Sequence, residues 1–364
     1  MNILYIITGL GGGGAEKVVV DLADKMYSLG NNVKIAYLTG DVVVKPKNSE
    51  IELISLNLNN VTCFYSAFKN FNVILRTYKP AVIHSHMFHA NIFSRISRLF
   101  FSIDKLICTA HSNYEGGRFR MLIYRMTHNL SDLITNVSFS ASSAFEKKGA
   151  VPKGQIKTVY NGIDLNKFNF NLKEHNDLRA ELKLEPNQKM LLSVGRLHHA
   201  KDYPNLLLAF AELCTMSSDK NPAKLFIVGA GELEELIIEQ IGTLKLQDNV
   251  KLLGRRSDIS SLMSAADLFV LSSSFEGFGL VVAEAMACNT FVVATDCGGV
   301  KEVMGGCGLL VPPKDSKALA QALQKALSIS ESEKTLNNFK ALEHVHTNFD
   351  LNEIFKIWLE LYEQ

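Results

Sequence analysis

Short apolar runs recur along the first half of the chain, and segments with helical spacing of apolar residues lie between many of them. The runs are rich in Ile, Val and Leu and span about five to seven residues, which is typical of strands buried in a sheet. Residues 16–30 follow the first run and have their apolar positions at helical spacing. The predicted strands of this half are residues 2–7, 32–38, 51–56, 81–86, 105–110, 133–138 and 156–160.

A second series with the same alternation begins near residue 189. Its helical patterns at 203–214 and 231–244 again separate short apolar runs. Strands that alternate with helices predict parallel sheets wound by helices, so the expected fold class is α/β with two Rossmann-like domains. The predicted strands of this series are residues 189–195, 224–231, 250–254, 267–274, 290–296 and 308–312.

The domain boundaries follow from these two series. A length of 364 residues suits two domains better than one. The polar segment 171–188 is interpreted as a linker or boundary, so we predict an N-terminal domain over residues 1–170 and a C-terminal domain over residues 171–345. Apolar positions at helical spacing within residues 346–364, including the single tryptophan, Trp358, predict a terminal helix that packs back across the domains.

Composition and charge limit the class of protein. The hydrophobic fraction of 47% is ordinary for a globular chain, and the six cysteines have no C-x-x-C or zinc spacing. No secretory signal pattern and no run of about 18 apolar residues is present, so we expect a cytoplasmic protein without a membrane span. Residues 1–170 hold 19 Lys and Arg against 11 Asp and Glu, whereas the remainder holds 19 against 26. This asymmetry either indicates an anionic partner of the first half or arises by chance.

Glycines follow the first predicted strand in the pattern G-x-G-x-x-G, at Gly9, Gly11 and Gly14. A glycine loop between a strand and a helix lets the backbone approach a diphosphate at the helix N-terminus. Asp41 follows the second predicted strand, where the ribose-binding acid of a dinucleotide enzyme belongs. An NAD-dependent oxidoreductase is therefore one candidate, although this motif alone is a weak signal.

Two cations follow the first strand of the second series. Arg196 and Lys201 lie five positions apart in the loop that leaves this strand. Arginine binds phosphate through a planar fork and lysine acts as a point charge, so the two could converge on a phosphate or diphosphate. The alternative is an ordinary basic loop in contact with water.

Two glutamates lie eight positions apart after the predicted strand at 267–274. Glu276 lies in the loop, where Gly277 and Gly279 free the backbone, and Glu284 falls inside the apolar stripe of the following helix. Backbone N–H groups at this helix start can donate to a ligand. A buried Glu284 needs a partner, which is either a pair of ribose hydroxyls or a structural group of the protein.

Together, these segments resemble the consecutive motifs of retaining glycosyltransferases of family 4, which have the GT-B fold. The E-x7-E spacing of Glu276 and Glu284 matches the hallmark of that family. The overall pattern resembles bacterial O-antigen and capsular polysaccharide glycosyltransferases, and it implies two Rossmann-like α/β domains facing across a cleft. The matching segments are residues 195–202, 228–236, 252–273, 275–288 and 294–303, with weaker matches at 13–16, 82–91 and 109–112.

The resemblance also implies a role for each matching residue. Arg196 and Lys201 would hold the donor diphosphate, and Glu284 would bind the ribose hydroxyls. As catalytic residues, Glu276 would lie near the reacting centre of the donor sugar, and His111 would contact the sugar from the other domain. As donor-binding groups, the backbone of Phe278, Gly279 and Leu280 would contact sugar hydroxyls. Arg256 would lie at the edge of the base, and the N–H of Gly14 would lie near the diphosphate.

By the same resemblance, the expected reaction moves a hexose or N-acetylhexosamine from a nucleotide sugar to a saccharide acceptor in surface polysaccharide synthesis. A UDP-sugar is the favoured donor, and GDP-mannose is the main alternative. No D-x-D occurs in the chain, so no metal ion or other cofactor is expected, and cations and helix N-termini would stabilise the leaving diphosphate. The reaction is expected on one face of the sugar, where the leaving phosphate takes the acceptor's proton. A nucleotide-sugar epimerase or hydrolase and a non-catalytic binder are the alternatives of the same fold.

The acceptor side has two basic segments and a histidine-rich one. Basic amphipathic segments either lie on anionic membrane surfaces or cover a domain core while their arginines face water. We expect peripheral contact with the inner face of the plasma membrane, an acceptor linked to a lipid diphosphate, and no nucleic-acid partner. The three histidines lack the further ligands that zinc requires, so hydrogen bonding at the cleft and structural roles stay open. The segments are residues 91–102 with Arg95 and Arg98, residues 117–126 with Arg118, Arg120 and Arg125, and residues 82–91 with His84, His86 and His89.

Overall fold

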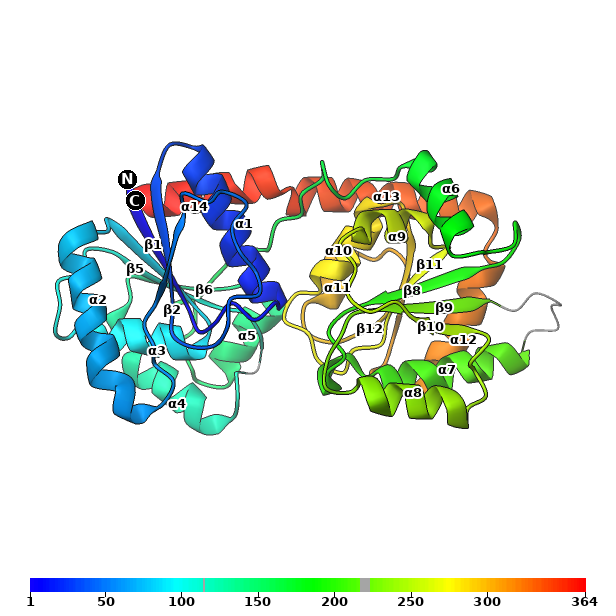
Figure 1. Ribbon diagram of the computed structural model, residues 1–364, viewed down its shortest axis with the longest axis horizontal. Helices are drawn as coiled ribbons and strands as arrows, with labels where there is room; N and C mark the ends of the chain where they lie inside the picture. Colours follow the sequence, from blue (N-terminus) through cyan, green and yellow to red (C-terminus); the bar gives the residue numbers. More distant parts are fainter. Residues whose placement is uncertain (114, 217–222) are drawn as a thin grey trace. The chain divides into compact units, whose positions relative to one another are not determined.

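The chain folds into two compact units (Figure 1). The division falls between Gly162 and Ile163, whereas the sequence places it after residue 170. The structure is a computed structural model that describes residues 1–113, 115–216 and 223–364. Unit 1 contains Met1–Gly162 and Asn352–Gln364, and unit 2 contains Ile163–Leu351.

Unit 1 is built on a seven-stranded sheet with the order β3-β2-β1-β4-β5-β6-β7. Neighbouring strands in the described residues are all parallel, and β4 and β5 are buried along their whole length. This burial explains the mostly apolar sequence of β5, whereas β4 also buries His84, Ser85 and His86. All seven strands predicted for this half are confirmed. The strands are β1 (Asn2–Ile7), β2 (Asn32–Tyr37), β3 (Glu52–Ser55), β4 (Val82–His86), β5 (Leu106–Ala110), β6 (Leu133–Asn136) and β7 (Lys157–Thr158).

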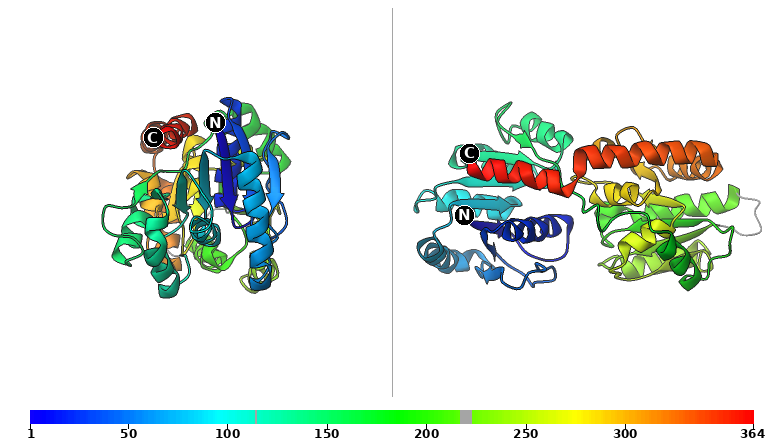
Figure 2. Two further views of the ribbon diagram at one scale, coloured as in Figure 1. Left: turned by 90° about the vertical axis from the view of Figure 1, so that its left-hand side faces the viewer. Right: turned by 90° about the horizontal axis from the view of Figure 1, so that it is seen from above.

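Helices lie on both faces of the unit 1 sheet (Figures 1 and 2). On one face, Phe71 and Phe93 pack with Leu4 and Ile83 in one buried apolar cluster. The described helices of this unit are α1 (Gly14–Ser28), η1 (Val61–Cys63), α2 (Phe64–Tyr78), α3 (Phe88–Ser97), α4 (Arg118–Thr127), η2 (His128–Leu130), α5 (Phe139–Lys147) and α14 (Leu351–Glu363), where η marks a short 3-10 helix.

The end of the chain covers the other face of the same sheet. Side chains alternate along a strand, so Tyr5 of β1 and His84 of β4 point away from the cluster of Leu4 and Ile83. They meet α14 instead: the hydroxyl of Tyr362 lies 3.1 Å from that of Tyr5 and 2.7 Å from Nδ1 of His84. The segment predicted as one terminal helix is thus the end of α13 followed by α14, and α14 packs on unit 1.

Unit 2 repeats the architecture with a six-stranded sheet of order β10-β9-β8-β11-β12-β13. Its described strand pairs are parallel, and the six strands predicted for the second series are confirmed. Helices α7, α8 and α12 bury their apolar residues against one face of this sheet. The strands are β8 (Met190–Val194), β9 (Lys224–Val228), β10 (Val250–Leu252), β11 (Leu268–Leu271), β12 (Phe291–Thr295) and β13 (Leu309–Val311).

The helices of unit 2 begin soon after the predicted boundary. The polar segment expected as a linker forms α6 instead, because its charged side chains have partners in the same unit: Arg179 donates to Asp267 at 3.1 Å. The C-terminal helix α13 starts with a capping box formed by Ser330 and Glu333. The described helices are α6 (Leu172–Glu181), η3 (His199–Lys201), α7 (Tyr203–Met216), α8 (Glu234–Thr243), α9 (Ile259–Ala265), α10 (Leu280–Ala287), α11 (Val300–Met304), α12 (Ser316–Ser328) and α13 (Glu331–Phe349).

Each sheet has a point where the strand order reverses. In unit 1 this switch lies between β1 and β4, and in unit 2 it lies between β8 and β11. Ligands of open parallel sheets bind beside the carboxyl ends of the strands at such a point. The loops that follow these four strands therefore define where each unit can hold a ligand.

Candidate functional site

Lys201 and Glu276 form an ion pair at the switch point of unit 2. Lys201 ends η3 after β8, and Glu276 lies in the loop after β11, so the sheet order brings together residues that are 75 positions apart. The Lys201 Nζ lies 2.5 Å from Glu276 Oε1, and the hydroxyl of Ser273 donates to the same oxygen at 2.7 Å. Both charged side chains are mostly buried, with exposed fractions of 21% and 13%. The pair therefore places a cation and a carboxylate at a position that is partly shielded from water.

Side-chain and backbone hydrogen bonds hold the loops that carry this pair. Ser272 donates its hydroxyl to the backbone carbonyl of Lys201 at 2.8 Å, and the backbone N–H of Ser274 donates to the carbonyl of Ala200 at 2.9 Å. From β12, the Thr295 hydroxyl donates to the Ser273 carbonyl at 2.5 Å. Three strand-end loops are thus tied to one another, which keeps the charged groups in a fixed arrangement.

Two glycines in these loops allow close backbone approach. A Cβ at Gly298, whose φ is +59°, would lie 1.8 Å from the carbonyl oxygen of Glu276. A Cβ at Gly229, whose φ is +146°, would lie 1.9 Å from the carbonyl oxygen of Gly195. Real atoms do not approach so closely, so any side chain here would displace the loop of Glu276 or the loop before Arg196. The glycine-rich strand ends of unit 2 therefore serve the geometry of the site.

Arg196 does not share a partner with Lys201. Its side chain is 66% exposed and lies 3.3 Å from Glu232, which also lies 3.5 Å from Nε2 of His198. A hydrogen bond to its own backbone, followed by the charges of His198 and Arg196, lowers the pKa of Glu232. The two predicted diphosphate cations are thus held by different carboxylates, and sequence reasoning missed Glu232, which adjoins a glycine in the loop after β9.

The loop and helix after Glu276 contain four more of the predicted donor contacts. Gly279 has a φ of +95° and precedes α10, whose start has no side-chain cap, and Leu280 is the first residue of the helix. The Phe278 ring is buried and meets Phe349 edge-on at 5.2 Å between centroids, so only the backbone of Phe278 remains for a ligand. Glu284 lies one turn into α10 and is 5% exposed.

Arg256 is held by carboxylates of unit 2. Its Nε and Nη2 donate to both oxygens of Asp258 at 2.8 and 2.5 Å, and its Nη1 donates to Glu181 at 2.9 Å. These hydrogen bonds raise the pKa of the guanidinium above its usual range. The predicted contact of Arg256 with a base stays a prediction. Asp258 lies only two positions away in the sequence, and this short spacing could have indicated the bidentate pair.

His111 lies in unit 1, directly after β5. Its Nε2 is 3.0 Å from Nδ1 of His86, the last residue of β4, and the two ring centroids are 5.2 Å apart. Burial lowers the pKa of His111 to about 4, and it lowers the pKa of His86 well below the usual value. Both rings are therefore neutral near pH 7. His84 instead bonds Tyr362 and Thr109 inside the sheet, which is a structural role.

Gly14 is the first residue of α1, immediately after the glycine loop that follows β1. The helix start has Gly13 as its cap residue and no side-chain cap. Of the predicted site residues, Gly14 and His111 thus lie in unit 1, and the other eight lie in unit 2. Of these ten residues, Lys201 and Glu276 are joined by a side-chain hydrogen bond.

The two basic segments of unit 1 differ sharply. In the first segment, Arg95 on α3 is fully buried together with Phe93, and the exposed apolar residues Leu99 and Phe100 lie after the end of the helix. In contrast, α4 exposes three apolar side chains at helical spacing. They are Phe119, Leu122 and Met126, with exposed fractions of 73%, 53% and 75%, and Arg118 and Arg125 are exposed on the same helix.

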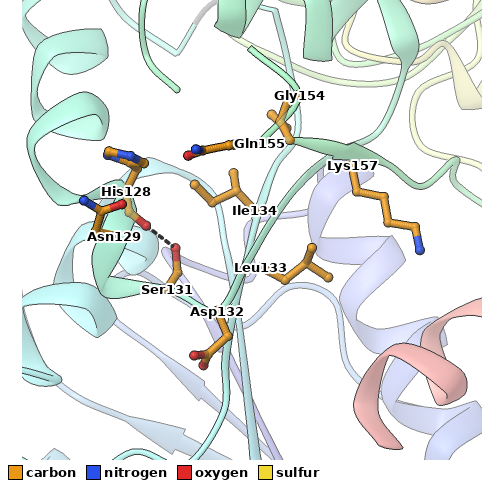
Figure 3. Close-up of a pocket in the computed structure, with 10 residues that line it drawn as sticks. His128, Asn129, Ser131, Asp132, Leu133, Ile134, Gly154, Gln155 and Lys157 are labelled. Carbon is orange, nitrogen blue, oxygen red and sulfur yellow. Dashed lines mark hydrogen bonds between the residues drawn. The ribbon is translucent and has the colours of Figure 1, made fainter. Parts of the chain in front are cut away.

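A cavity of about 580 Å³ lies at the edge of the unit 1 sheet opposite to the edge that carries His111 (Figure 3). Leu133 and Lys157, which line it, are the first residues of β6 and β7, so the cavity is at the amino ends of the strands. Its walls include His128, whose carbonyl accepts the Ser131 hydroxyl at 3.0 Å. None of the predicted site residues lines it. Across residues 1–113, 115–216 and 223–364, no three His, Cys, Asp or Glu side chains are grouped so that they could hold a metal ion.

Comparison with known proteins decides the family. The family described as "Glycosyl transferases group 1" matches residues 174–341, and "Glycosyltransferase Family 4" matches residues 12–167. The chain belongs to glycosyltransferase family 4. This membership of the glycosyltransferases decides against the oxidoreductase that the G-x-G-x-x-G pattern left open.

Curated relatives of this glycosyltransferase differ in how much of the chain they match. N-acetyl-alpha-D-glucosaminyl L-malate synthase of Bacillus anthracis is 30% identical over 64% of this chain and 59% of its own length. A second relative, from Campylobacter jejuni, is 26% identical over 91% of this chain and 92% of its own length. Its name is N-acetylgalactosamine-N,N'-diacetylbacillosaminyl-diphospho-undecaprenol 4-alpha-N-acetylgalactosaminyltransferase. The first match thus spans less than two thirds of its relative, whereas the second is nearly end to end.

Solved structures identify the fold of this glycosyltransferase as GT-B. Sucrose-phosphate synthase from Thermosynechococcus elongatus matches with a TM-score of 0.86 at 23% identity, over 100% of this chain and 99% of the other. Anabaena HepE in complex with UDP matches with a TM-score of 0.84 at 23% identity, over 100% of both chains. At this identity the likeness concerns the fold alone. The expected α/β fold with two Rossmann-like domains is confirmed.

Proposed function

We propose that this glycosyltransferase moves a hexose or N-acetylhexosamine from a UDP-sugar to a saccharide linked to a lipid diphosphate, with retention at the anomeric carbon. The observation that carries the proposal is the pair of Lys201 and Glu276 at the switch point of unit 2. A cation fixed at this place is available to the diphosphate, and the carboxylate beside it is available to the sugar.

The donor diphosphate is held by positive groups at the strand ends of unit 2. Lys201 supplies a point charge, the exposed Arg196 supplies a planar fork, and the uncapped start of α10 after Gly279 supplies free N–H groups and a helix dipole. Negative charge on the diphosphate grows as the anomeric C–O bond breaks, so these groups stabilise the transition state more than the bound donor. They do the work of a metal ion, and the buried Glu284 receives the ribose hydroxyls.

Glu276 and His111 act on the donor sugar. When the diphosphate takes over the charge of Lys201, the Glu276 carboxylate can accept a hydrogen bond from a sugar hydroxyl. His111 is neutral above pH 5, because burial lowers its pKa to about 4. A neutral ring can hydrogen-bond the sugar without placing a positive charge beside the oxocarbenium-like centre, which a protonated histidine would destabilise.

Transfer with retention takes place on one face of the sugar. The acceptor oxygen forms its bond to the anomeric carbon on the face from which the diphosphate leaves. The C–O bond to the phosphate breaks, and the leaving phosphate oxygen takes the acceptor's proton. No covalent sugar–enzyme adduct forms, so isolation of a kinetically competent adduct would contradict this step.

A UDP-sugar and a lipid-linked acceptor are supported by the relatives. HepE has been solved with UDP and with UDP-glucose, and the Campylobacter relative is named for a diphospho-undecaprenol acceptor. The excess of Lys and Arg over Asp and Glu in residues 1–170 favours an anionic partner on the acceptor side. No nucleic acid is proposed as a partner.

The membrane contact is assigned to α4, at the inner face of the plasma membrane. Its exposed apolar stripe of Phe119, Leu122 and Met126 enters the lipid interface, and its exposed arginines face anionic headgroups. Within the described part of the chain, none of the helices is both long and apolar enough to span a bilayer. Contact through α4 would bring unit 1 to a lipid-linked acceptor.

Donor choice is tested by thermal unfolding with UDP, GDP, UDP-glucose, UDP-N-acetylglucosamine and GDP-mannose. UDP and one UDP-sugar are expected to raise the Tm, and GDP is expected to have a smaller effect, because binding to the native state alone stabilises it. Stabilisation by GDP and GDP-mannose alone would contradict the UDP assignment.

Transfer itself is tested by product analysis with and without an undecaprenyl-diphosphate-linked saccharide. A glycosylated lipid indicates transfer, whereas free sugar or an epimerised donor in both samples indicates the hydrolase or epimerase alternative. Glu276→Ala is expected to remove most turnover, and Glu239→Ala, an exposed glutamate of α8, serves as the matched control. Full turnover of Glu276→Ala would show that Glu276 has been assigned wrongly.

The α4 contact is tested by sedimentation with vesicles of phosphatidylcholine and phosphatidylglycerol. At low salt the protein is expected in the vesicle pellet, and high salt is expected to release it, because surface charges are screened. Changing Phe119, Leu122 and Met126 to Ser is expected to abolish binding, whereas changing the exposed Leu336 and Phe339 of α13 to Ser is the control. Equal binding of both variants would remove α4 from the proposal.

A further inference from the structure

A buried network of polar side chains links α4 to the residue after β5. Glu115 accepts the backbone N–H of His111 on Oε1 at 3.1 Å and the hydroxyl of Tyr124 on Oε2 at 2.5 Å. The Tyr124 hydroxyl in turn accepts a hydrogen bond from the amide of Asn91 at 3.2 Å. The oxygen of this amide accepts the Ser85 hydroxyl of β4 at 2.7 Å. The network therefore runs from β4 through two helices to the backbone of His111.

Glu115 is followed by two glycines with positive φ. Gly116 and Gly117 have φ values of +100° and +96°. Glycine adopts this backbone conformation, and others, without steric strain. The carbonyl of Glu115 also accepts Nη1 of Arg120 at 2.9 Å. Among the described contacts, the carboxylate and the backbone carbonyl of Glu115 therefore connect its loop to α4.

Cations surround this buried carboxyl. Arg95 is fully buried, and its guanidinium carbon lies 5.1 Å from the centroid of the Tyr124 ring. Burial raises the pKa of Glu115, and the two hydrogen bonds and the charges of Arg120 and Arg95 oppose this rise. When it is ionised, the Glu115 carboxylate accepts hydrogen bonds more strongly than a neutral amide oxygen would, so Glu115→Gln is expected to weaken the bond to the His111 N–H.

We propose that Glu115 and Tyr124 are positioning residues that hold the backbone of His111, and thereby its ring, in the geometry that sugar transfer requires. The inference rests on the role proposed for His111. The ring also contacts His86, so the backbone bond to Glu115 and this ring contact both help to define where the imidazole points. Misplacement by about 1 Å can cost about 10²-fold in rate, so loss of the anchor reduces kcat without weakening the donor site of unit 2.

Tyr124→Phe and Glu115→Gln test the proposal. Tyr124→Phe keeps the ring beneath Arg95 and removes only the hydroxyl, and Glu115→Gln keeps the shape and removes the charge. Each is expected to lower kcat by at least about tenfold with UDP-glucose or UDP-N-acetylglucosamine and an undecaprenyl-diphosphate-linked saccharide, while KM for the nucleotide sugar changes less than about twofold. The double variant is expected to lose little more than either single variant, because both remove one anchor.

The matched controls come from the same unit. Tyr78→Phe removes a hydroxyl that donates to the carbonyls of Ile3 and Asn32, and Glu146→Gln alters a carboxylate that accepts the N–H of Gly154 at 2.7 Å. Neither contact reaches His111, so both controls are expected to keep kcat within about twofold. A merely structural role for Glu115 and Tyr124 would lower the Tm of the variants and leave kcat of the folded fraction unchanged, which would overturn the proposal.

Amide hydrogen exchange separates this inference from the proposed function. The His111 amide is expected to exchange at least about tenfold faster in Tyr124→Phe and in Glu115→Gln than in the wild-type protein, and the controls are expected to leave it unchanged. Unchanged exchange in both test variants overturns the anchor, even if transfer is observed. Accelerated exchange together with full turnover of His111→Ala means that the anchor exists but the catalytic role proposed for His111 is wrong.

Discussion

The strand-end loops of the two units carry groups of different charge on closely similar sheets. In unit 2, the loops after β8 and β11 pair Lys201 with Glu276, and Arg196 lies beside Glu232. In unit 1, the corresponding edge holds His86 and His111, whose pKa values burial lowers so that both rings are neutral. The same architecture thus carries an ion pair of Lys201 and Glu276 in unit 2 and two neutral imidazole rings in unit 1.

This difference matches the two halves of a nucleotide sugar. A diphosphate gains negative charge as it leaves and needs fixed cations, which unit 2 holds at its switch point. In the proposed function, a sugar that becomes oxocarbenium-like needs hydrogen-bonding groups without added positive charge, and the neutral imidazole of His111 would meet this need. Both units are doubly wound sheets, so the proposed roles rest on the side chains at the strand ends and not on the fold.

The sharpest test of the comparison is Lys201→Ala. It is expected to lower kcat/KM for the UDP-sugar by about 10²–10³-fold, because it removes a preorganised cation from the leaving diphosphate and leaves the mostly buried Glu276 without its cation. UDP release in steady-state kinetics measures the effect. Lys325→Ala, an exposed lysine of α12, is the control. Activity of Lys201→Ala within about twofold of wild type would mean that unit 2 does not rely on this charge.

The second test concerns the glycines of the two units. Gly298→Ala is expected to destabilise the protein by at least about 2 kcal/mol and to reduce turnover, because its φ is +59° and its Cβ would meet the Glu276 carbonyl at 1.8 Å. Gly11→Ala in unit 1 is the matched control, because a Cβ there meets nothing within 4 Å. Chemical denaturation measures both variants. Similar stability of the two would contradict the argument that backbone contact requires the glycine in unit 2.

The third and smallest test concerns pH. Unfolded His111 takes up a proton below about pH 6.5, whereas folded His111 stays neutral down to about pH 4. The unfolded state therefore binds more protons between these values, and the free energy of unfolding falls as the pH falls from 6.5 toward 4, by up to about 1.4 kcal/mol for each pH unit. His111→Asn is expected to show a shallower dependence in urea unfolding across this range. An unchanged slope would mean that His111 titrates normally in the folded protein.

Much of the fold could be predicted from local pattern. The strands of both sheets follow from short, mostly apolar runs, because strands buried on both faces are rich in apolar residues, and the observed strands fall within the predicted ones. The polar segment 171–188 is interpreted from the sequence as a linker or boundary, and the structure shows that it contains α6. In the structure, Arg179 donates to the Asp267 carboxylate, and Nδ1 of His175 hydrogen-bonds the backbone carbonyl of Ser264. Both partners are about 90 residues away in the sequence, so a local pattern cannot predict these contacts.

The partners of the site residues were beyond sequence reasoning for the same physical reason. Lys201 meets Glu276 because β8 and β11 are neighbours in the sheet, although β9 and β10 lie between them in the chain. A burial pattern also depends on the fold: Arg95 looks like a surface arginine in the sequence, yet it is fully buried, with its guanidinium over the ring of Tyr124. Pairings of this kind follow from strand order and helix packing.

Taken alone, the sequence determined the alternation of strands and helices, the family motifs, and the residue types available at the strand ends, because each depends on spacing within about ten residues. Tertiary structure decided which of these groups meet. The sheet order joined Lys201 to Glu276, the return of α14 placed Tyr362 against His84, and burial made His111 neutral. Charge pairing and desolvation are properties of neighbours in space, and only the folded chain determines those neighbours.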